Sequence, residues 1–227
     1  DLDTGSYTGT ADGGADTDIL RIDSSTADAT VTASGFNNFE TLDLTGDNEI
    51  TLSGTSTFDD VTLDGATSLN IGSGDSLTVA NNITGDTGAN ILTVEGNVSG
   101  NVDLSSGDDT FALDLDTGSY TGAADGGAGT DTISVDSSSG DAVFTAGSLS
   151  NFENLNLTGD NDITVDGTSV FDDVTLSADT DITVAAGDSL TASNGITGDT
   201  GVNDVTIAGV VNAAIDQAAG DDTLTLD

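Results

Sequence analysis

The chain repeats itself at a fixed distance, and this repeat constrains its fold more than any other feature of the sequence. Residues 1–9 return unchanged as residues 114–122, and the same offset of 113 residues then holds without a gap to residue 226. More than half of the paired positions are identical, and exchanges at apolar positions mostly keep an apolar side chain. Such arrays bury a common core by stacking neighbouring units. We therefore expect two repeat periods, residues 1–113 and 114–226, in one continuous solenoid that is an excerpt of a longer array.

Short segments in which apolar and polar residues alternate make up most of each period. Residues 41–44, 49–53, 60–63 and 76–79 show the two-residue period of half-buried β-strands, and no segment shows the 3.6-residue period of a helix. Glycine, aspartate, asparagine or serine closes each segment, as expected for tight turns. Apolar residues such as Leu42 recur at intervals of roughly 17–20 residues, which suits one coil of a parallel β-helix. Each period would then hold about five or six coils.

Two tandem antiparallel β-sandwiches, one for each period, are the alternative fold, because short alternating strands and frequent turns fit them as well. Three observations favour the β-helix. Turn residues occur every few positions rather than at hairpin spacing. Aromatic residues make up only 4% of the chain, whereas a sandwich core usually contains several large side chains. The first and last residues also stand at the same phase of the repeat, which suits a continuous column.

The charge of the chain is strongly one-sided, with 41 acidic residues, one basic residue and a formal net charge of −40. Binding of nucleic acid needs lysine and arginine to neutralise phosphates, so a nucleic-acid partner is excluded. No apolar run approaches the length of a membrane span, and we expect no membrane insertion by this segment. Repulsion among so many carboxylates destabilises a compact chain, which predicts a saline or calcium-containing setting.

The residues that most catalytic sites need are missing. The chain contains no histidine and no cysteine, which excludes Ser-His and Cys-His nucleophiles and a zinc site built from these residues. The one base, Arg21, has Ser134 as its counterpart in the second period. Carboxylate pairs such as Asp59 and Asp60 occur in both periods, which indicates turn or surface roles rather than a glycosidase site. We expect no enzymatic activity.

Residues 126–134, Gly-Gly-Ala-Gly-Thr-Asp-Thr-Ile-Ser, are followed by Asn-Phe-Glu-Asn-Leu at residues 151–155. This pattern resembles the passenger domains of bacterial autotransporters and related repetitive surface proteins, and the resemblance extends over both periods. It implies a right-handed parallel β-helix outside the cell that acts as an adhesive or structural stalk. The chain departs from those proteins in containing no tryptophan.

The same nine residues match the RTX nonapeptide, in which glycines free the turn and carbonyls and an aspartate bind Ca²⁺. The copy in the first period is incomplete, because Asp16 stands where the third glycine is expected. Shorter Gly-Asp-Asp-Thr segments match part of the motif in both periods. The alternative is a solvated acidic turn, in which glycine serves the backbone geometry alone. The candidate Ca²⁺ ligands in these complete and partial motifs are Gly127, Gly129, Asp131, Asp18, Asp109 and Asp222.

These patterns together predict a structural repeat on the bacterial cell surface, forming a stalk, fibre or filament with an adhesion or spacing role and no catalysis. A calcium-dependent adhesin or a lattice protein of the S-layer type is the alternative. The expected partners are neighbouring repeats of the same chain and other copies of it, assembled end to end or side by side. Calcium is the one cofactor that the motifs suggest.

Overall fold

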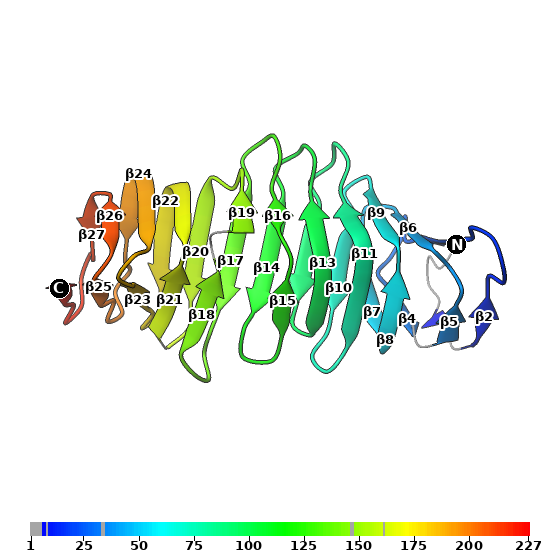
Figure 1. Ribbon diagram of the computed structural model, residues 1–227, viewed down its shortest axis with the longest axis horizontal. Helices are drawn as coiled ribbons and strands as arrows, with labels where there is room; N and C mark the ends of the chain where they lie inside the picture. The colour runs from blue at the N-terminus through cyan, green and yellow to red at the C-terminus, as the bar shows by residue number, and fades with distance from the viewer. Residues whose placement is uncertain (1–5, 8, 33–34, 146–147, 161) are drawn as a thin grey trace. The chain divides into compact units, whose positions relative to one another are not determined.

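The structure is a computed structural model and describes residues 6–7, 9–32, 35–145, 148–160 and 162–227. It is a β-solenoid in which parallel strands stack in about ten turns, and the described residues contain no α-helix (Figure 1). The predicted parallel β-helix is therefore confirmed. The sandwich alternative is wrong, because the described strand pairs are parallel and a sandwich is built from antiparallel strands.

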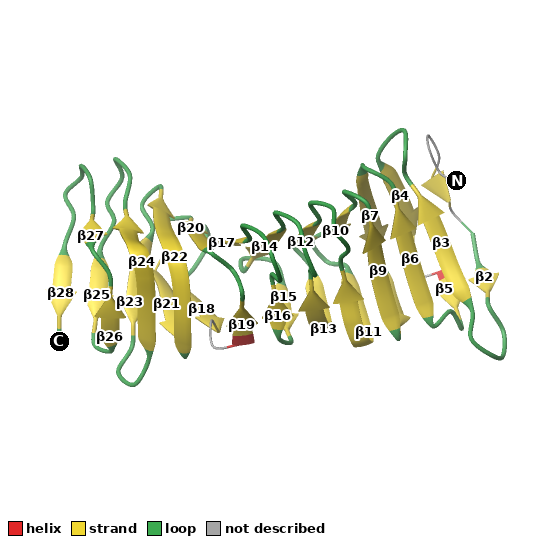
Figure 2. Cartoon of the chain, turned by 90° about the horizontal axis from the view of Figure 1, so that it is seen from above, coloured by secondary structure: helices red, strands yellow, loops and turns green. Residues whose placement is uncertain are grey.

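The chain forms two compact units. The first contains Asp1–Leu113 and Thr117–Asp131, and the second contains Asp114–Asp116 and Thr132–Asp227. Each unit has its own set of stacked strands, and most of each coil is strand rather than loop (Figure 2).

All but two of the described strands of the first unit form three stacks, and the remaining two, Ala11–Asp12 and Phe36–Asn37, pair with each other in a separate sheet. In chain order the strands of this unit are β1 (Ser6–Tyr7), β2 (Ala11–Asp12), β3 (Ile19–Asp23), β4 (Ala29–Thr32), β5 (Phe36–Asn37), β6 (Thr41–Thr45), β7 (Glu49–Ser53), β8 (Thr55–Phe58), β9 (Asp60–Asp64), β10 (Ser68–Ile71), β11 (Ser76–Thr84), β12 (Ile91–Val94), β13 (Asn97–Asp103), β14 (Thr110–Asp114), β15 (Ser119–Thr121) and β16 (Ala124–Asp125). One stack runs β1-β4-β7-β10-β12-β14, a second contains β8, β11, β13 and β15, and a third runs β3-β6-β9 and continues through the later halves of β11 and β13 to β16. One coil is thus three short strands joined by corners.

The second unit repeats this arrangement. Its strands are β17 (Thr132–Asp136), β18 (Ala142–Thr145), β19 (Leu149–Ser150), β20 (Asn154–Thr158), β21 (Asp162–Asp166), β22 (Thr168–Ser177), β23 (Asp181–Val184), β24 (Ser189–Thr197), β25 (Val205–Ile207), β26 (Val210–Asn212), β27 (Ile215–Asp216) and β28 (Leu224–Leu226). The sheet β18-β21-β23-β25-β28 has five stacked strands, and the stack in the first unit that ends with β14 has six. Both agree with the predicted five or six coils per period.

The register of the strands explains the core. In β7, β10 and β12 the partners Thr51, Asn70 and Thr93 face outward at the same level, and the residues on either side of them face inward. Every second residue is therefore buried, as a pleated strand requires. The inward columns of this stack are Ile50, Leu69, Leu92 and Phe111, and Leu52, Ile71, Val94 and Leu113, all fully or almost fully buried.

The core can be tested with two neighbours on β12. Leu92 is fully buried, whereas 40% of the adjacent Ile91 is exposed, because successive side chains point to opposite faces. We expect Leu92→Ala to lower the free energy of unfolding by about 2–5 kcal/mol, through lost burial and the cavity left behind. Ile91→Ala should change it by about 0.5 kcal/mol or less. Urea unfolding of both variants measures the difference, and equal losses would contradict the assigned register.

Candidate functional site

Carboxylates at the corners accept hydrogen bonds from the backbone of the neighbouring coil. The ladder of strand hydrogen bonds is interrupted at a corner, and each backbone N–H there needs another acceptor. Asp75 Oδ1 accepts from Gly54 N at 2.7 Å, and Asp86 Oδ2 accepts from Gly65 N at 3.1 Å. Acidic residues at the corners therefore have a structural function. Lysine and arginine could not replace them there, because their side chains have no acceptor atom.

The second period repeats these contacts at the equivalent positions. Asp188 Oδ1 accepts from Gly167 N at 3.0 Å, and Asp199 Oδ2 accepts from Ala178 N at 3.0 Å. Asp86 and Asp199 also cap their own turns, as acceptors from the backbone N–H groups two residues later. A single carboxylate thus links two successive coils through its two oxygens.

A column of buried polar side chains runs along one corner of the first unit. It contains Thr67, Asn90, Asp109 and Asp131, each at most 1% exposed, and we call it the buried polar column. Asn90 N donates to Asp109 Oδ1 at 2.7 Å, and Asp109 N donates to Asp131 Oδ1 at 2.8 Å. Thr67 Oγ1 donates to the carbonyl of Gly46 at 2.8 Å. Each side chain therefore satisfies a backbone group of the adjacent coil.

The second unit has the corresponding residues Thr180, Asn203 and Asp222, of which Thr180 and Asn203 are buried and Asp222 is partly exposed. Asn203 N donates to Asp222 Oδ1 at 2.8 Å, as Asn90 N does to Asp109. The side-chain amide of Asn203 makes three further contacts. It accepts from Asp199 N at 2.9 Å, and it donates to the carbonyls of Ala178 at 2.9 Å and Thr180 at 3.4 Å. The column is thus a property of the repeat.

Asp109 of the buried polar column has a raised pKa. Burial is the largest cause and raises the pKa of its carboxyl to about 6, while the hydrogen bond from Asn90 N lowers it in part. The charges of Asp131, Asp108 and Asp86 raise this pKa further. The side chain also has a buried oxygen, Oδ2, without a hydrogen-bond partner. Two buried carboxylates next to each other favour a proton on one of them.

The structure brings together only some of the predicted calcium ligands. Asp109 and Asp131 are neighbours in the buried polar column, and Gly127 and Gly129 lie in the turn that leads to Asp131. Asp18 lies at the start of β3, where its N–H donates to Glu40 Oε2 at 2.8 Å. Asp222 is one of the corresponding residues of the second unit.

The hydrogen bonds of these residues limit how many oxygens they could offer to calcium. Ca²⁺ takes six to eight oxygen ligands, but one oxygen of each carboxylate, Asp109 and Asp131, already accepts a backbone N–H. Over the described part of the chain, no group of three or more acidic side chains is placed to hold a metal ion. The arrangement explains the acidic turns as structural, and calcium binding stays a prediction.

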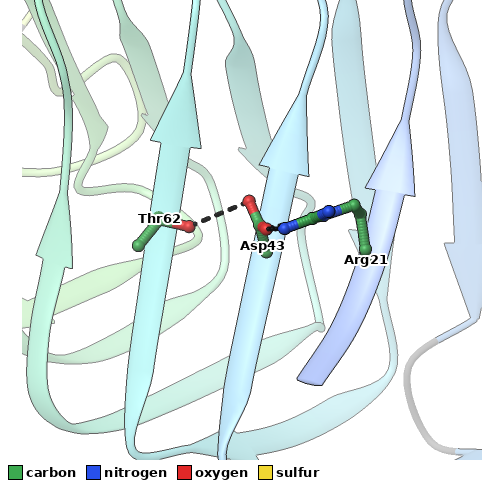
Figure 3. Close-up of polar contacts among 3 residues, drawn as sticks. All are labelled: Arg21, Asp43 and Thr62. Atoms are coloured by element: carbon green, nitrogen blue, oxygen red, sulfur yellow. Dashed lines mark hydrogen bonds and ion pairs between the residues drawn. The ribbon is translucent and has the colours of Figure 1, made fainter.

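Arg21 forms an ion pair with Asp43 on the adjacent strand of the third stack (Figure 3). Arg21 Nε donates to Asp43 Oδ2 at 2.7 Å, and Thr62 Oγ1 donates to Asp43 Oδ1 at 3.1 Å. The Asp43 side chain is buried, whereas 67% of the Arg21 side chain is exposed. In the second period the counterparts are Ser134 and Asn156, so that the arginine and its carboxylate are replaced together. The pair therefore has a structural role.

A depression of about 250 Å³ lies in the second unit beside β22. Three apolar residues, Phe152, Val170 and Phe171, and three polar residues, Asn151, Glu153 and Asp172, line it. Both phenylalanines are almost fully buried, so they offer no stacking surface to a ligand.

Comparison with family models, with curated proteins and with solved structures found no match to this chain. Among the described residues, no helix has the length and hydropathy of a membrane span. The geometry of the corners and of the core is therefore the basis for any functional proposal.

Sequence reasoning missed the buried polar column and the acceptor role of the corner carboxylates. A signal was present, since Asn90 returns unchanged as Asn203 although the residues on either side of it differ, and Asp109 returns as Asp222 within an unchanged Gly-Asp-Asp-Thr segment. A polar residue that is the same in both periods can indicate a side chain that is hydrogen-bonded to the backbone. Alternation of apolar and polar residues could not reveal this, because it describes strands and not corners.

The ion pair is testable with the residues that the second period itself contains. We expect Arg21→Ser to lower the free energy of unfolding by about 1–2 kcal/mol, because the buried Asp43 carboxylate loses its charged donor. The free energy of unfolding of the double variant R21S/D43N should differ from that of the wild type by about 0.5 kcal/mol or less. The amide that replaces the Asp43 carboxylate carries no charge and needs no charged donor. Urea unfolding of Arg21→Ser, Asp43→Asn and the double variant decides this. A loss in the double variant equal to the sum of the two single losses would show that the two side chains do not depend on each other.

The pKa of Asp109 predicts a pH dependence of stability. The folded-state pKa of about 6 lies above the ordinary value of 3.8, so the carboxyl binds its proton more tightly in the folded chain. The contribution of this carboxyl to the free energy of unfolding is complete below about pH 4 and is lost as the pH rises through 6. We expect Asp109→Asn to gain stability relative to the wild type between pH 4 and pH 7, because the amide cannot ionise.

Urea unfolding of both chains at several pH values in 1 M NaCl gives this measurement. At that salt concentration the Debye length is about 3 Å, so repulsion among the surface carboxylates is largely screened. A stability difference that stays constant with pH would contradict the elevated pKa.

Proposed function

We propose that this chain is a structural spacer, a stretch of a stalk or fibre on the bacterial cell surface that separates other parts of an assembly and performs no catalysis. The single observation that carries the proposal is the continuous stacking of similar coils within each unit. Core side chains form unbroken columns, and corner side chains bond to the backbone of the next coil. Both groups of residues serve the stacking itself.

Stacked coils suit a mechanical role for a physical reason. Each coil is bonded to the next through the backbone of three strands and through corner side chains such as Asp75 and Asn90. Loads along the axis are then shared by many hydrogen bonds, each with a net contribution of about 1 kcal/mol. Length is set by the number of coils, so duplication of a period lengthens the spacer without a new core.

The charge supports a location outside the cell. A net charge of −40 on 227 residues repels itself, and salt or cations relieve that repulsion. The same charge keeps surfaces of neighbouring chains apart, which suits a spacer. The resemblance to repetitive bacterial surface proteins points the same way.

A calcium-dependent adhesin or lattice protein is the second candidate. The observation in its favour is the contact between the buried residues Asp109 and Asp131, where a bound cation would neutralise two adjacent carboxylates. In that case the chain needs a divalent ion for its stability or its lateral contacts. The plain spacer does not.

Proteins with one, two and three copies of residues 1–226 in tandem test the spacer role. Five or six coils at a strand spacing of roughly 4.8 Å predict that each 113-residue period adds about 25–29 Å to the maximum dimension in small-angle X-ray scattering. A globular arrangement would grow far more slowly, with the radius of gyration rising as about the 0.38 power of length. Linear growth that persists in EDTA supports the plain spacer.

Loss of the extended form in EDTA, restored by Ca²⁺ and not by Na⁺ at equal ionic strength, would favour the calcium-dependent candidate. Growth at the globular rate with and without EDTA would overturn both.

A further inference from the structure

One strand segment inside the second unit is paired along only one of its two edges. The first half of β22, residues 168–171, pairs in parallel with β24, whereas residues 173–177 also pair with β20 of the preceding coil. Among the described strands, none pairs with residues 168–171 on the side of the preceding coil. We call this side of residues 168–171 the open edge. Strands β18 and β20 precede it and β23 and β24 follow it, so it lies within the stack of the second unit.

The direction of the backbone groups shows which residues face the open edge. The carbonyl of Gly167 accepts from the backbone N–H of the first residue of β24 at 2.9 Å, so Gly167 faces β24. Asp172 N donates to the carbonyl of Glu153 in the preceding coil at 2.7 Å, so Asp172 faces the other way. Alternation along a strand then places the N–H and C=O groups of Thr168 and Val170 at the open edge. These are the groups with which an added strand bonds.

The depression beside β22 lies along the open edge. Its lining comes from residues 151–153 of the preceding coil and from residues 170–172 of β22 itself. Phe152 and Phe171 are each only 3% exposed, whereas 65% of Val170 is exposed. The depression thus offers an exposed apolar side chain next to backbone groups that no described strand occupies.

The unpaired edge is a property of the repeat, whereas the exposed valine is not. In the first unit β8 pairs with β11 alone among the described strands, and β8 is the equivalent of residues 168–171. Asn38 and Asn151, in the coil that precedes each edge, both have a φ of 54°, a left-handed conformation that interrupts a strand. Thr57 stands at the position of Val170, so the apolar contact belongs to the second unit.

The charge beside the open edge determines which partner fits. Glu153 and Asp172 line the depression, and Asp173 follows on β22. A second copy of this chain, with 41 acidic residues and a net charge of −40, would bring like charges against them. Its one basic residue, Arg21, forms the ion pair with Asp43. A segment that carries lysine or arginine has the complementary charge.

We propose that the open edge binds an extended, basic peptide segment of another protein, which adds one strand to β22. The peptide backbone bonds to Thr168 and Val170. One apolar side chain contacts Val170, and lysine or arginine side chains face Glu153 and Asp172. Strand addition of this kind takes its affinity from main-chain hydrogen bonds and its specificity from alternate side chains. The site does not depend on the spacer role, so failure of either proposal leaves the other in place.

Fluorescence anisotropy of a dye-labelled peptide measures this interaction. The probe is Lys-Val-Lys-Val-Lys-amide, added to the wild-type chain in about 0.15 M NaCl, where the Debye length is about 8 Å. The acidic surface attracts any cationic peptide, so Lys-Lys-Val-Val-Lys-amide and a backbone N-methylated form of the probe serve as controls of equal charge. We expect the probe to bind at least about tenfold more tightly than the N-methylated form, which lacks the main-chain donors.

Substitutions along the open edge locate the binding. Val170→Pro removes the N–H group at its centre, and proline is tolerated there because no described strand bonds to this group. We expect Val170→Pro to weaken binding about tenfold. Val170→Thr, which introduces the first-period residue, should weaken it about two- to fivefold through lost apolar contact. Asp172→Asn should weaken it about two- to fivefold, and its matched control Asp59→Asn, the same change at the equivalent position of the first period, by less than about 1.5-fold.

Three results would contradict the proposal. The first is equal affinity for the probe and either control peptide, which would show that an added strand takes no part. The second is equal loss in Asp172→Asn and Asp59→Asn, which would show general attraction to the acidic surface. The third is self-association of the wild-type chain in light scattering that Val170→Thr abolishes, which would make a second copy the occupant. If Val170→Pro disturbs the fold, as circular dichroism would show, the N-methylated peptide and Val170→Thr decide the question.

Discussion

The parallel stacking of coils at one strand spacing is the constraint on which the rest of the structure depends. Coils at that spacing must present the same kind of residue at the same level, so Leu69, Leu92 and Phe111 form one column inside the solenoid. The same spacing excludes side chains where two corners approach, as at Gly129. Core, corners and glycines are therefore consequences of a single geometric requirement.

The unusual charge of the chain follows from the corners rather than from a binding function alone. Corners leave backbone N–H groups without ladder partners, and a short side chain with acceptor oxygens satisfies them best. Asp75 and Asp86 do this for the adjacent coil, and Asp109 does it inside the protein with a raised pKa. Repulsion among the carboxylates is the cost of this solution, and it makes the stability dependent on salt and pH.

Much of the fold could be predicted from the sequence, whereas little of the site could. Strict alternation in β6, β7 and β9 and the roughly regular recurrence of apolar residues predicted strands, coils and their number, because burial on one face imposes a period of two. The prediction of roughly 17–20 residues per coil was less accurate. Thr51, Asn70 and Thr93 are 19 and 23 residues apart, since three strands with corners of unequal length make one coil.

By itself, the sequence determined the period and the apolar positions, because these depend on patterns that neighbouring residues reveal. It favoured the parallel solenoid over tandem sandwiches, and the parallel strand pairs of the structure decided between the two. Only the tertiary structure decided which residues meet across coils. Asp43 accepts hydrogen bonds from Arg21 and Thr62 on the strands on either side, although these partners are 22 and 19 residues away in the chain. Asp109 likewise contacts Asp131, which is 22 residues away. Register between coils sets such contacts, and it depends on the length of every corner in between. The physical reason is that stacking acts between coils, whereas the sequence is read along them.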